Sequence, residues 1–236
     1  MSRVRSWLTA NRRETAIVAS LLFATAVCGA LLVVRAMYAR STAHFGLVWN
    51  LFLAWLPMLS ALLAHHLHKQ GRRLVWPLIV PCLLFWLLFF PNAPYILTDM
   101  LHLQWPQARV PVWYDLILLI AFAWTGAFLG LISLFLVHGL VRQWAGRAAG
   151  WLFTLGVIAV SGFGVYLGRF PRWNSWDLLT NPSLLLMDIW TRLSNPLANS
   201  RTFVFSALFS LCLAMMYLML VAVAQFPTDE RRRADD

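Results

Sequence analysis

The chain has 236 residues, of which 61% are hydrophobic and only 12% are charged. This composition excludes an ordinary soluble globular domain and indicates a protein whose solvent is mainly lipid. The formal net charge of +10 is typical of contact with anionic membrane lipid. Nucleic-acid binding is excluded, because no soluble segment is long enough to fold into a basic groove.

Six stretches of 17 or more residues lack Asp, Glu, Lys and Arg, apart from one Asp at the mouth of a span. A bilayer core needs about 20 apolar residues per helix, and none of the stretches alternates like a barrel strand. The sequence therefore predicts an all-α, polytopic membrane protein, a six-transmembrane-helix bundle in a single integral membrane domain (1–236) with a short charged tail at 227–236. The predicted spans are 15–34, 46–64, 74–90, 116–137, 148–167 and 202–226.

The first span is preceded by four arginines and resembles a signal peptide in this respect. Its 20-residue apolar core is longer than that of a cleaved signal, so we expect it to remain as a helix. With the N-terminus inside, twelve Lys and Arg residues lie on the cytoplasmic side and seven on the outer side. Because basic residues are retained inside, we expect both termini to be cytoplasmic.

The third predicted span ends abruptly at Pro91, Asn92, Ala93 and Pro94. The prolines remove two amide donors and disfavour a helix at the residue before each of them. If the following residues form a helical turn or two, Asp99 and His102 share one face at i, i+3 spacing. Such a pair suits proton transfer or part of a metal site. The alternative is a helix-start carboxylate beside a solvated histidine.

Asp115 opens the fourth predicted span at its outer end. The helix macrodipole stabilises a carboxylate there, which is a sufficient structural reason for it. An ionisable group at the mouth of a span is also a functional candidate. The candidate catalytic residues are therefore Asp99, His102 and Asp115.

The fourth and fifth spans each contain a pair of glycines four residues apart, Gly126 with Gly130 and Gly164 with Gly168. Small residues on one face allow helix backbones to approach closely in lipid. We expect the two spans to pack on each other through these faces.

The segment after the fifth span places two arginines beside two tryptophans on the outer side. Guanidinium groups there suit a phosphate, a carboxylate or the lipid headgroups. Asp177 follows Asn174 and Ser175 in the pattern of a helix N-terminus, and a capping role is the structural alternative for it. The candidate ligand-binding residues are Asn92, Arg169, Arg172, Trp173, Asn174, Trp176 and Asp177.

A short helix is predicted from Pro182, which suits the first helical position. It is strongly apolar except for Asp188 and Arg192, which form an i, i+4 pair. At about 12 residues it is too short to span, so we expect it to lie flat on the outer interface. The chain contains no phosphate-binding loop, metal-binding helix motif or nucleophile elbow. The sequence therefore predicts no metal and no cofactor.

Three segments carry a family resemblance: LFFPNAPYILTDMLHL from Leu88, WYDLILLIAFAWTG from Trp113 and GFGVYLGRFPRWNSWD from Gly162. Together they resemble the uncharacterised bacterial membrane-protein family called domain of unknown function 1361, over spans two to six. The resemblance implies a multi-pass protein of the bacterial inner (cytoplasmic) membrane. It implies no reaction and no catalytic residues.

The leading functional hypothesis is an outer-face polar pocket that binds or moves a small or lipid-linked anionic ligand. One alternative is a membrane enzyme acting on a lipid-linked substrate, with Asp99 or His102 as general base. The other is a non-catalytic assembly partner whose interfacial helix contacts a second membrane protein. The expected partners are thus membrane lipid, an anionic ligand and, in the last case, a membrane protein.

Overall fold

The computed structural model describes residues 12–42, 44–71, 76–104 and 110–225, and all regular elements in these ranges are helices. The tail at 227–236 and several of the residues used to predict the orientation lie outside them, namely Arg3, Arg5, Arg72, Arg73, Arg109, Arg231, Arg232 and Arg233. Five helical stretches of the described part are long and apolar enough to cross a membrane. These stretches are Glu14–Ala39, Gly46–Lys69, Pro77–Leu103, Val112–Arg169 and Ser200–Gln225.

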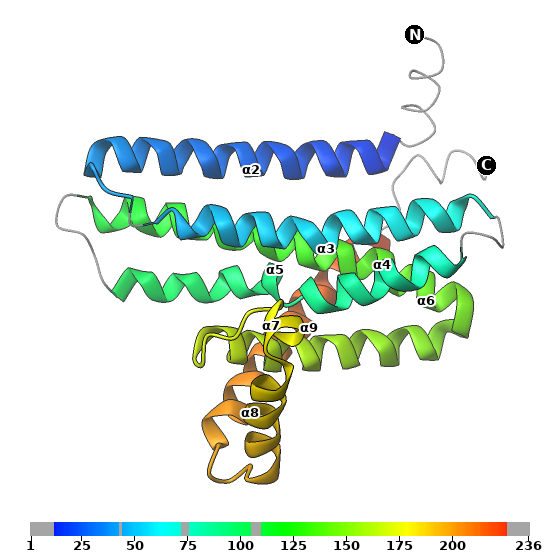
Figure 1. Cartoon of the computed structure of the whole chain (residues 1–236). Helices are drawn as coiled ribbons and strands as arrows, with labels where there is room; N and C mark the ends of the chain where they lie inside the picture. The colour runs from blue at the N-terminus through cyan, green and yellow to red at the C-terminus, as the bar shows by residue number, and fades with distance from the viewer. Residues whose placement is uncertain (1–11, 43, 72–75, 105–109, 226–236) are drawn as a thin grey trace.

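The long helices are α2 (Arg12–Ala39), α3 (Gly46–Lys69), α6 (Val112–Arg169) and α9 (Ser200–Gln225). Helix α3 packs against α6, which also contacts α2 and α9. Figure 1 shows α2, α3 and α6 running side by side, with α6 turning back on itself. The reversal is at Gly146, whose φ of 90° and ψ of 174° are not helical. Only glycine adopts such angles readily, so α6 is divided there into a first and a second arm.

The break at the end of the third predicted span has the form that the prolines predict. Helix α4 (Trp76–Phe89) ends, the single turn α5 (Asn92–Tyr95) follows, and the chain continues as the 3-10 helix η2 (Ile96–Gln104). Asn92 Nδ2 donates to the carbonyl of Phe89 at 3.0 Å, and thereby satisfies a backbone acceptor near the end of the helix. The predicted helical turns that carry Asp99 and His102 are therefore confirmed.

The glycine pairs of α6 do not pack on each other, so that expectation is wrong. A Cβ atom on Gly126 would lie 3.0 Å from the carbonyl oxygen of Ala93, and one on Gly164 would lie 3.2 Å from Pro91 Cγ. At both glycines, the missing side chain leaves room for the α5 turn and the residues next to it. The two arms contact each other through larger apolar side chains, including Leu134 and Val157. The small residues allow the backbone of the α5 turn to approach both arms closely.

Beyond α6 the chain forms the short helices α7 (Asp177–Thr180) and α8 (Pro182–Ser194). Arg192 Nη2 lies 2.9 Å from Asp188 Oδ1, which confirms the predicted i, i+4 pair. Asp188 also accepts a hydrogen bond from Trp173 Nε1 at 2.9 Å, and Arg192 donates to Thr202 Oγ1 at 3.2 Å. The polar face of α8 is therefore turned toward the rest of the protein. In Figure 1, α8 runs across the direction of α2 and α3.

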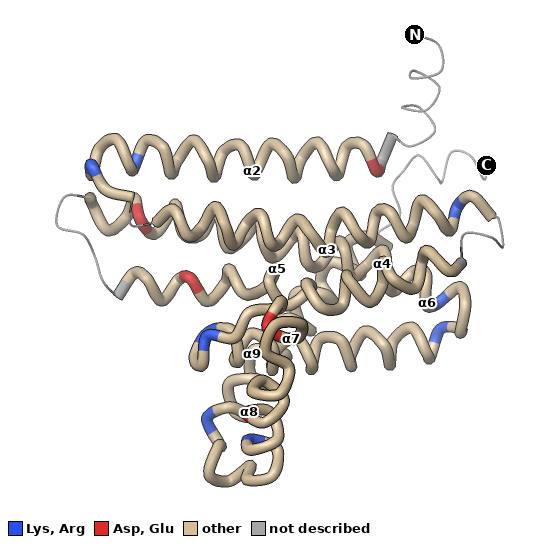
Figure 2. Tube along the Cα trace, in the orientation of Figure 1, with Lys and Arg blue, Asp and Glu red and all other residues tan. Residues whose placement is uncertain are grey.

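Charged residues gather toward the two ends of the long helices, and the middle parts of α2 and α3 carry none (Figure 2). At one end, Lys69 of α3 pairs with Glu14 of α2. At the other end lie the start of α6 and the loop before α7, whereas the α5 turn lies about midway along α2 and α3 (Figure 1), inside the apolar stretch Pro77–Leu103. This second end, which corresponds to the outer side in the sequence-based orientation, contains most of the sequence-predicted site residues.

Candidate functional site

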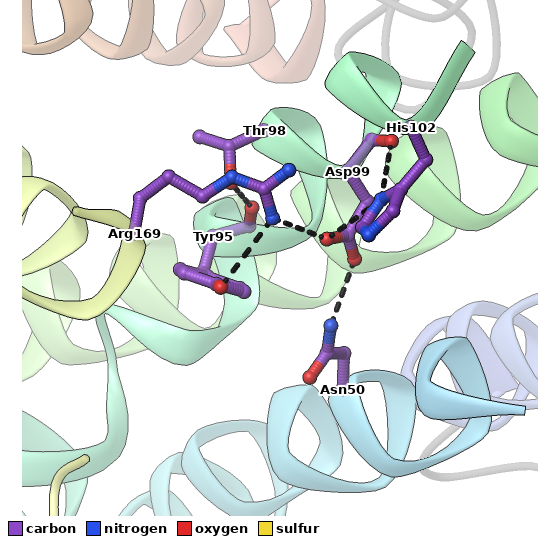
Figure 3. Close-up of polar contacts among 6 residues, drawn as sticks. All are labelled: Asn50, Tyr95, Thr98, Asp99, His102 and Arg169. Atoms are coloured by element: carbon purple, nitrogen blue, oxygen red, sulfur yellow. Dashed lines mark hydrogen bonds and ion pairs between the residues drawn. The ribbon is translucent and has the colours of Figure 1, made fainter. Parts of the chain in front are cut away.

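Asp99 is a buried carboxylate held by two different helices. It lies in the first turn of η2, and its side chain is 2% exposed. Asn50 Nδ2 of α3 donates to its Oδ2 at 2.8 Å, and Arg169 Nη1 at the end of α6 donates to its Oδ1 at 3.0 Å. Figure 3 shows these two side chains approaching the carboxylate from different directions. A buried charge is costly unless it is paired and hydrogen-bonded, so this arrangement supplies what Asp99 needs.

His102 lies above Asp99 on the same face of η2, because residues three apart are eclipsed in a 3-10 helix. Its Nδ1 is 2.9 Å from the carbonyl oxygen of Asp99 and 3.6 Å from Oδ1 of the carboxylate. The bond to the carbonyl requires a proton on Nδ1, which leaves Nε2 as the acceptor of the neutral ring. His102 is 46% exposed at its side chain, in contrast to the carboxylate that it covers.

Tyr95 and Arg169 extend the cluster toward the break. Arg169 Nη1 is 3.5 Å from the Tyr95 hydroxyl, and its guanidinium carbon lies 5.8 Å from the centre of the ring. Thr98 Oγ1 donates to the Tyr95 carbonyl at 2.6 Å and stabilises the turn that leads to Asp99. Gly168 allows this contact, since a Cβ atom there would lie 3.3 Å from the Tyr95 ring. Arg169, Tyr95 and Asp99 are thus brought together by the break packing on the second arm of α6.

A cavity of about 910 Å³ opens beside this cluster, and we call it the basic cavity. Its volume is in the range of small-molecule binding sites. Asp99 is the one acidic side chain among the described residues that line it. The acidic and basic side chains that line it are His44, Asp99, His102, Arg169, Arg172 and Arg201.

Arg172 lines the basic cavity in an unusual backbone conformation. Its φ is 66°, in the left-handed region that favours glycine. The preceding Pro171 ends the helix, and Trp173 N–H donates to the carbonyl of Leu167 at 3.0 Å to close the turn. An arginine in this backbone conformation is strained, whereas glycine would not be. Backbone strain of this kind is concentrated at functional sites.

A second, smaller cavity of about 220 Å³ adjoins the first, and we call it the side cavity. The two cavities share five lining residues, which are Trp49, Asn50, Tyr95, Gly168 and Asn174. The side cavity also includes Asn92, whose Nδ2 donates to Ser175 Oγ at 2.9 Å. No charged side chain is among its described lining residues.

Asp115 belongs to a different cluster from Asp99. Arg35 of α2 binds its carboxylate through both oxygens, with Nε at 2.5 Å from Oδ1 and Nη2 at 3.1 Å from Oδ2. Both residues are buried, at 1% and 5% exposure. The described lining of the basic cavity does not include Asp115. It therefore joins α2 to the start of α6 instead of facing the cavity.

His44, in the loop between α2 and α3, lies between the two charge clusters. Its ring centre is 6.3 Å from that of His102, and it lines the basic cavity. Burial lowers the pKa of His44, and the Arg35 cation lowers this pKa further, against the opposing effect of the Asp115 carboxylate. His44 is consequently a neutral hydrogen-bonding group at pH 7.

Asp177 has a local structural role. Its Oδ2 accepts the backbone N–H of Asn174 at 2.7 Å, and Thr180 Oγ1 donates to its Oδ1 at 3.3 Å. The hydrogen bond from the Asn174 amide lowers the pKa of this exposed carboxyl. Asp177 stabilises the turn before α7, as the capping alternative predicted, and it is not among the described residues that line either cavity.

The structure thus brings together part of the predicted set. Asp99, His102, Arg169, Arg172 and Asn174 line the basic cavity. Asn92, Trp173 and again Asn174 line the side cavity. Trp176 is not among the described lining residues, but it contacts Trp49, which lines both cavities, edge to face with ring centres 6.3 Å apart.

Sequence reasoning missed Asn50, His44, Arg35 and Arg201 as members of these clusters. Asn50 had a detectable signal, since it is a polar residue in an apolar run near the outer end of a span. Arg35 had the same kind of signal and was used only for orientation. Arg201 lies 4.6 Å over the Phe170 ring, a contact across 31 residues that no local pattern indicates.

No group of three or more His, Cys, Asp or Glu residues in the described part is placed to hold a metal ion. The chemistry available is instead that of anion binding by guanidinium groups and of proton exchange at His102 and Asp99.

These features define an all-helical membrane protein with a basic cavity at one end of its long helices. The chain belongs to the family described as Protein of unknown function (DUF1361), whose model matches residues 49–216. This match confirms the resemblance seen in the three sequence segments, and it includes the Asp99 cluster. No curated protein and no solved structure matches the chain.

Proposed function

We propose that this protein crosses the bacterial inner membrane six times, with both termini in the cytoplasm. The bend at Gly146 supports this count, because it divides the 58-residue α6 into two arms that run back along each other. The excess of basic residues on the side of the termini, twelve against seven, supports the orientation. The basic cavity then lies on the outer face, and α8 lies at the outer interface.

We further propose that the basic cavity binds an anionic ligand. The observation that carries this proposal is the charge imbalance of its described lining, which has three arginines against one carboxylate. Asp99 is already engaged by Asn50 and Arg169. Arg172 and Arg201 therefore contribute positive charge that the lining does not neutralise. A phosphate or carboxylate group is the natural complement of such guanidinium groups.

The exposure of each arginine supports a different role for it in the basic cavity. Arg169 is 13% exposed at its side chain and orders the cavity wall through its contact with Asp99. Arg172 and Arg201 are exposed and can contact a ligand directly. Trp49, which lines both cavities, and Trp176, which is in edge contact with it, add the amphipathic rings that are typical of the headgroup level.

Ethyl phosphate, titrated onto the purified protein, tests the proposal by thermal unfolding. A ligand present at 100 times its Kd adds about 2.7 kcal/mol to the stability of the form that binds it. We expect ethyl phosphate to raise the unfolding temperature by several degrees above that in sodium chloride of the same ionic strength. In Arg172→Gln and Arg201→Gln this increment should be lost.

The control is Arg147→Gln, because Arg147 is an exposed arginine just after the bend, at the opposite end of the second arm of α6 from Arg169. It should retain the full increment. An increment that is equal in all three variants would mean that phosphate acts nonspecifically, and it would contradict the proposed cavity function.

A membrane enzyme acting on a lipid-linked substrate is the second candidate. The geometry that favours it is the His102 ring, which lines the cavity, holds its Nδ1 against the Asp99 carbonyl and leaves Nε2 to accept a proton. His102→Gln should then abolish conversion of a labelled lipid extract while ethyl phosphate still stabilises the variant. Equal conversion by the variant and the unchanged protein would exclude His102 as the general base.

A further inference from the structure

The two adjoining cavities differ in polarity in the way that the two parts of a lipid do. The basic cavity contains all of the charged lining residues, whereas the side cavity is lined mainly by apolar groups, among them Leu53, Leu88, Val165 and Leu185. Building on the proposed anion site, we propose that the ligand is an anionic amphiphile. Its phosphate or carboxylate headgroup occupies the basic cavity, and the first part of its hydrocarbon chain occupies the side cavity.

Continuity of the two spaces is the first argument. Trp49, Tyr95 and Gly168 are among the residues that form walls of both cavities, so a single molecule can extend from one into the other. The side cavity of about 220 Å³ is several times larger than the roughly 30 Å³ of one water molecule. It therefore has room for a segment of hydrocarbon chain, and its described lining offers no charged side chain to a second headgroup.

The shape of the wall is the second argument. Gly164 and Gly168 of α6 line the side cavity without side chains. A Cβ atom on Gly164 would lie 3.2 Å from Pro91 Cγ, so the break packs directly against this helix face. The break therefore forms one wall of the side cavity, which Pro91 and Asn92 also line. The same break positions Asp99 and Tyr95 at the basic end.

The lipid-facing rim is the third argument. Leu178 of α7 lines the side cavity and is 43% exposed, so the cavity wall reaches the outer surface of the protein there. Neighbouring Leu179 is 76% exposed and does not line the cavity. In the proposed orientation this surface faces lipid near the outer interface, where an amphiphile resides. A lipid can thus enter sideways, without leaving the membrane.

A photoreactive probe tests where the hydrocarbon chain of the ligand lies. Dodecyl phosphate with a diazirine within the first few carbons of its chain is added to the protein in phosphatidylcholine nanodiscs, and adducts are mapped by peptide mass spectrometry. We expect adducts concentrated on the side-cavity residues Leu53, Leu88 and Leu185. Dodecanol with the same diazirine should label the lipid-facing surface without this concentration.

Leu178→Trp fills the mouth of the side cavity and should abolish the concentrated labelling, with Leu179→Trp as the matched control that retains it. Leu178→Phe is the second variant should the tryptophan prevent folding. Arg172→Gln and Arg201→Gln should also abolish the concentrated labelling, because the headgroup is no longer held.

Adducts spread evenly over the apolar surfaces of α2 and α9 would overturn the inference. If ethyl phosphate still stabilises the protein through Arg172 and Arg201 in that case, the anion site stands and only the lipid assignment falls. If ethyl phosphate gives no stabilisation and dodecyl phosphate gives no concentrated adducts, both proposals fall together.

Discussion

Asp99 and Asp115 are carboxylates at equivalent positions in the sequence, each near the outer end of an apolar segment, yet their surroundings differ. Arg35 binds both oxygens of Asp115 and buries the pair between α2 and α6. Asp99 divides its two oxygens between Asn50 and Arg169 and lines the basic cavity. The first carboxylate is therefore a link between helices, and the second is part of the candidate site.

The Arg35–Asp115 pair gives a prediction about stability. Removal of one partner of a buried ion pair leaves an uncompensated charge and costs about 3–5 kcal/mol. We expect Arg35→Met alone, or Asp115→Leu alone, to destabilise the protein by this amount. The double variant should recover much of the loss, because no buried charge remains. The free energy of unfolding, measured by denaturing-detergent titration, checks this.

The control for this set of single and double variants is the Lys69–Glu14 ion pair at the opposite end of the bundle. This pair is more exposed than Arg35 and Asp115. Exposed ion pairs contribute only about 0–1 kcal/mol, so Lys69→Met should have little effect. A double variant of Arg35 and Asp115 that is as unstable as the single variants would contradict the assigned role of the pair.

Among the elements, α8 shows most clearly which solvent surrounds the protein. Its polar residues Asp188 and Arg192 contact Trp173, Thr202 and the face of Tyr166. Several of its apolar residues point outward, and Leu184, Met187 and Trp190 are exposed. A surface helix of a soluble protein has the opposite arrangement. The orientation of α8 is thus the one expected for a helix whose outer face contacts lipid.

The second arm of α6 gives a prediction about helix packing. A Cβ atom on Gly162 would lie 2.6 Å from the Ser206 carbonyl oxygen of α9 and would collide with the Ser210 hydroxyl, whereas one on Gly156 meets no atom within 4 Å. Gly162→Ala should lower the free energy of unfolding by about 1–3 kcal/mol, as overpacking does.

Gly156→Ala is the matched control on the same arm. It should be neutral or stabilising by up to about 1 kcal/mol, because alanine is the better helix former. Equal effects of the two substitutions on the detergent-unfolding midpoint would show that the contact between α6 and α9 does not depend on the missing side chain at Gly162.

At the scale of the whole molecule, the distribution of charge to the two ends of the helices and the bend of α6 give a prediction about topology. If α6 crosses the membrane twice, its bend lies inside and the loops next to Thr42 and Asn195 lie outside. After Cys28, Cys82 and Cys212 are replaced by alanine, single cysteines are introduced at Thr42, Gly71, Arg147 and Asn195. An impermeant maleimide added to intact cells should label Thr42→Cys and Asn195→Cys.

Gly71→Cys and Arg147→Cys should react only after the membrane is made permeable. Labelling of Arg147→Cys and Asn195→Cys from the same side would contradict the six crossings, because α6 would then not return across the membrane.

Much of the fold was predictable because hydropathy and helix breaking are local properties of a chain. The apolar stretches determined the helices, the prolines at 91 and 94 determined where α4 ends, and Asp188 and Arg192 were recognisable as a pair from their spacing alone. The glycine pairs were correctly recognised as sites of close approach. Their partner, the α5 break, was not predictable, because a small residue does not specify which backbone approaches it.

The sequence by itself therefore determined the solvent of this protein, the ends of its helices and the concentration of charge at those ends. Only the tertiary structure decided which charges meet: Arg35 with Asp115 across 80 residues, and Asp99 with Arg169 across 70. Ion pairing depends on which helices are neighbours and on the depth of each side chain. Neither quantity is encoded by the spacing of residues along one helix, so the cavity and its excess of positive charge emerge only when the helices pack.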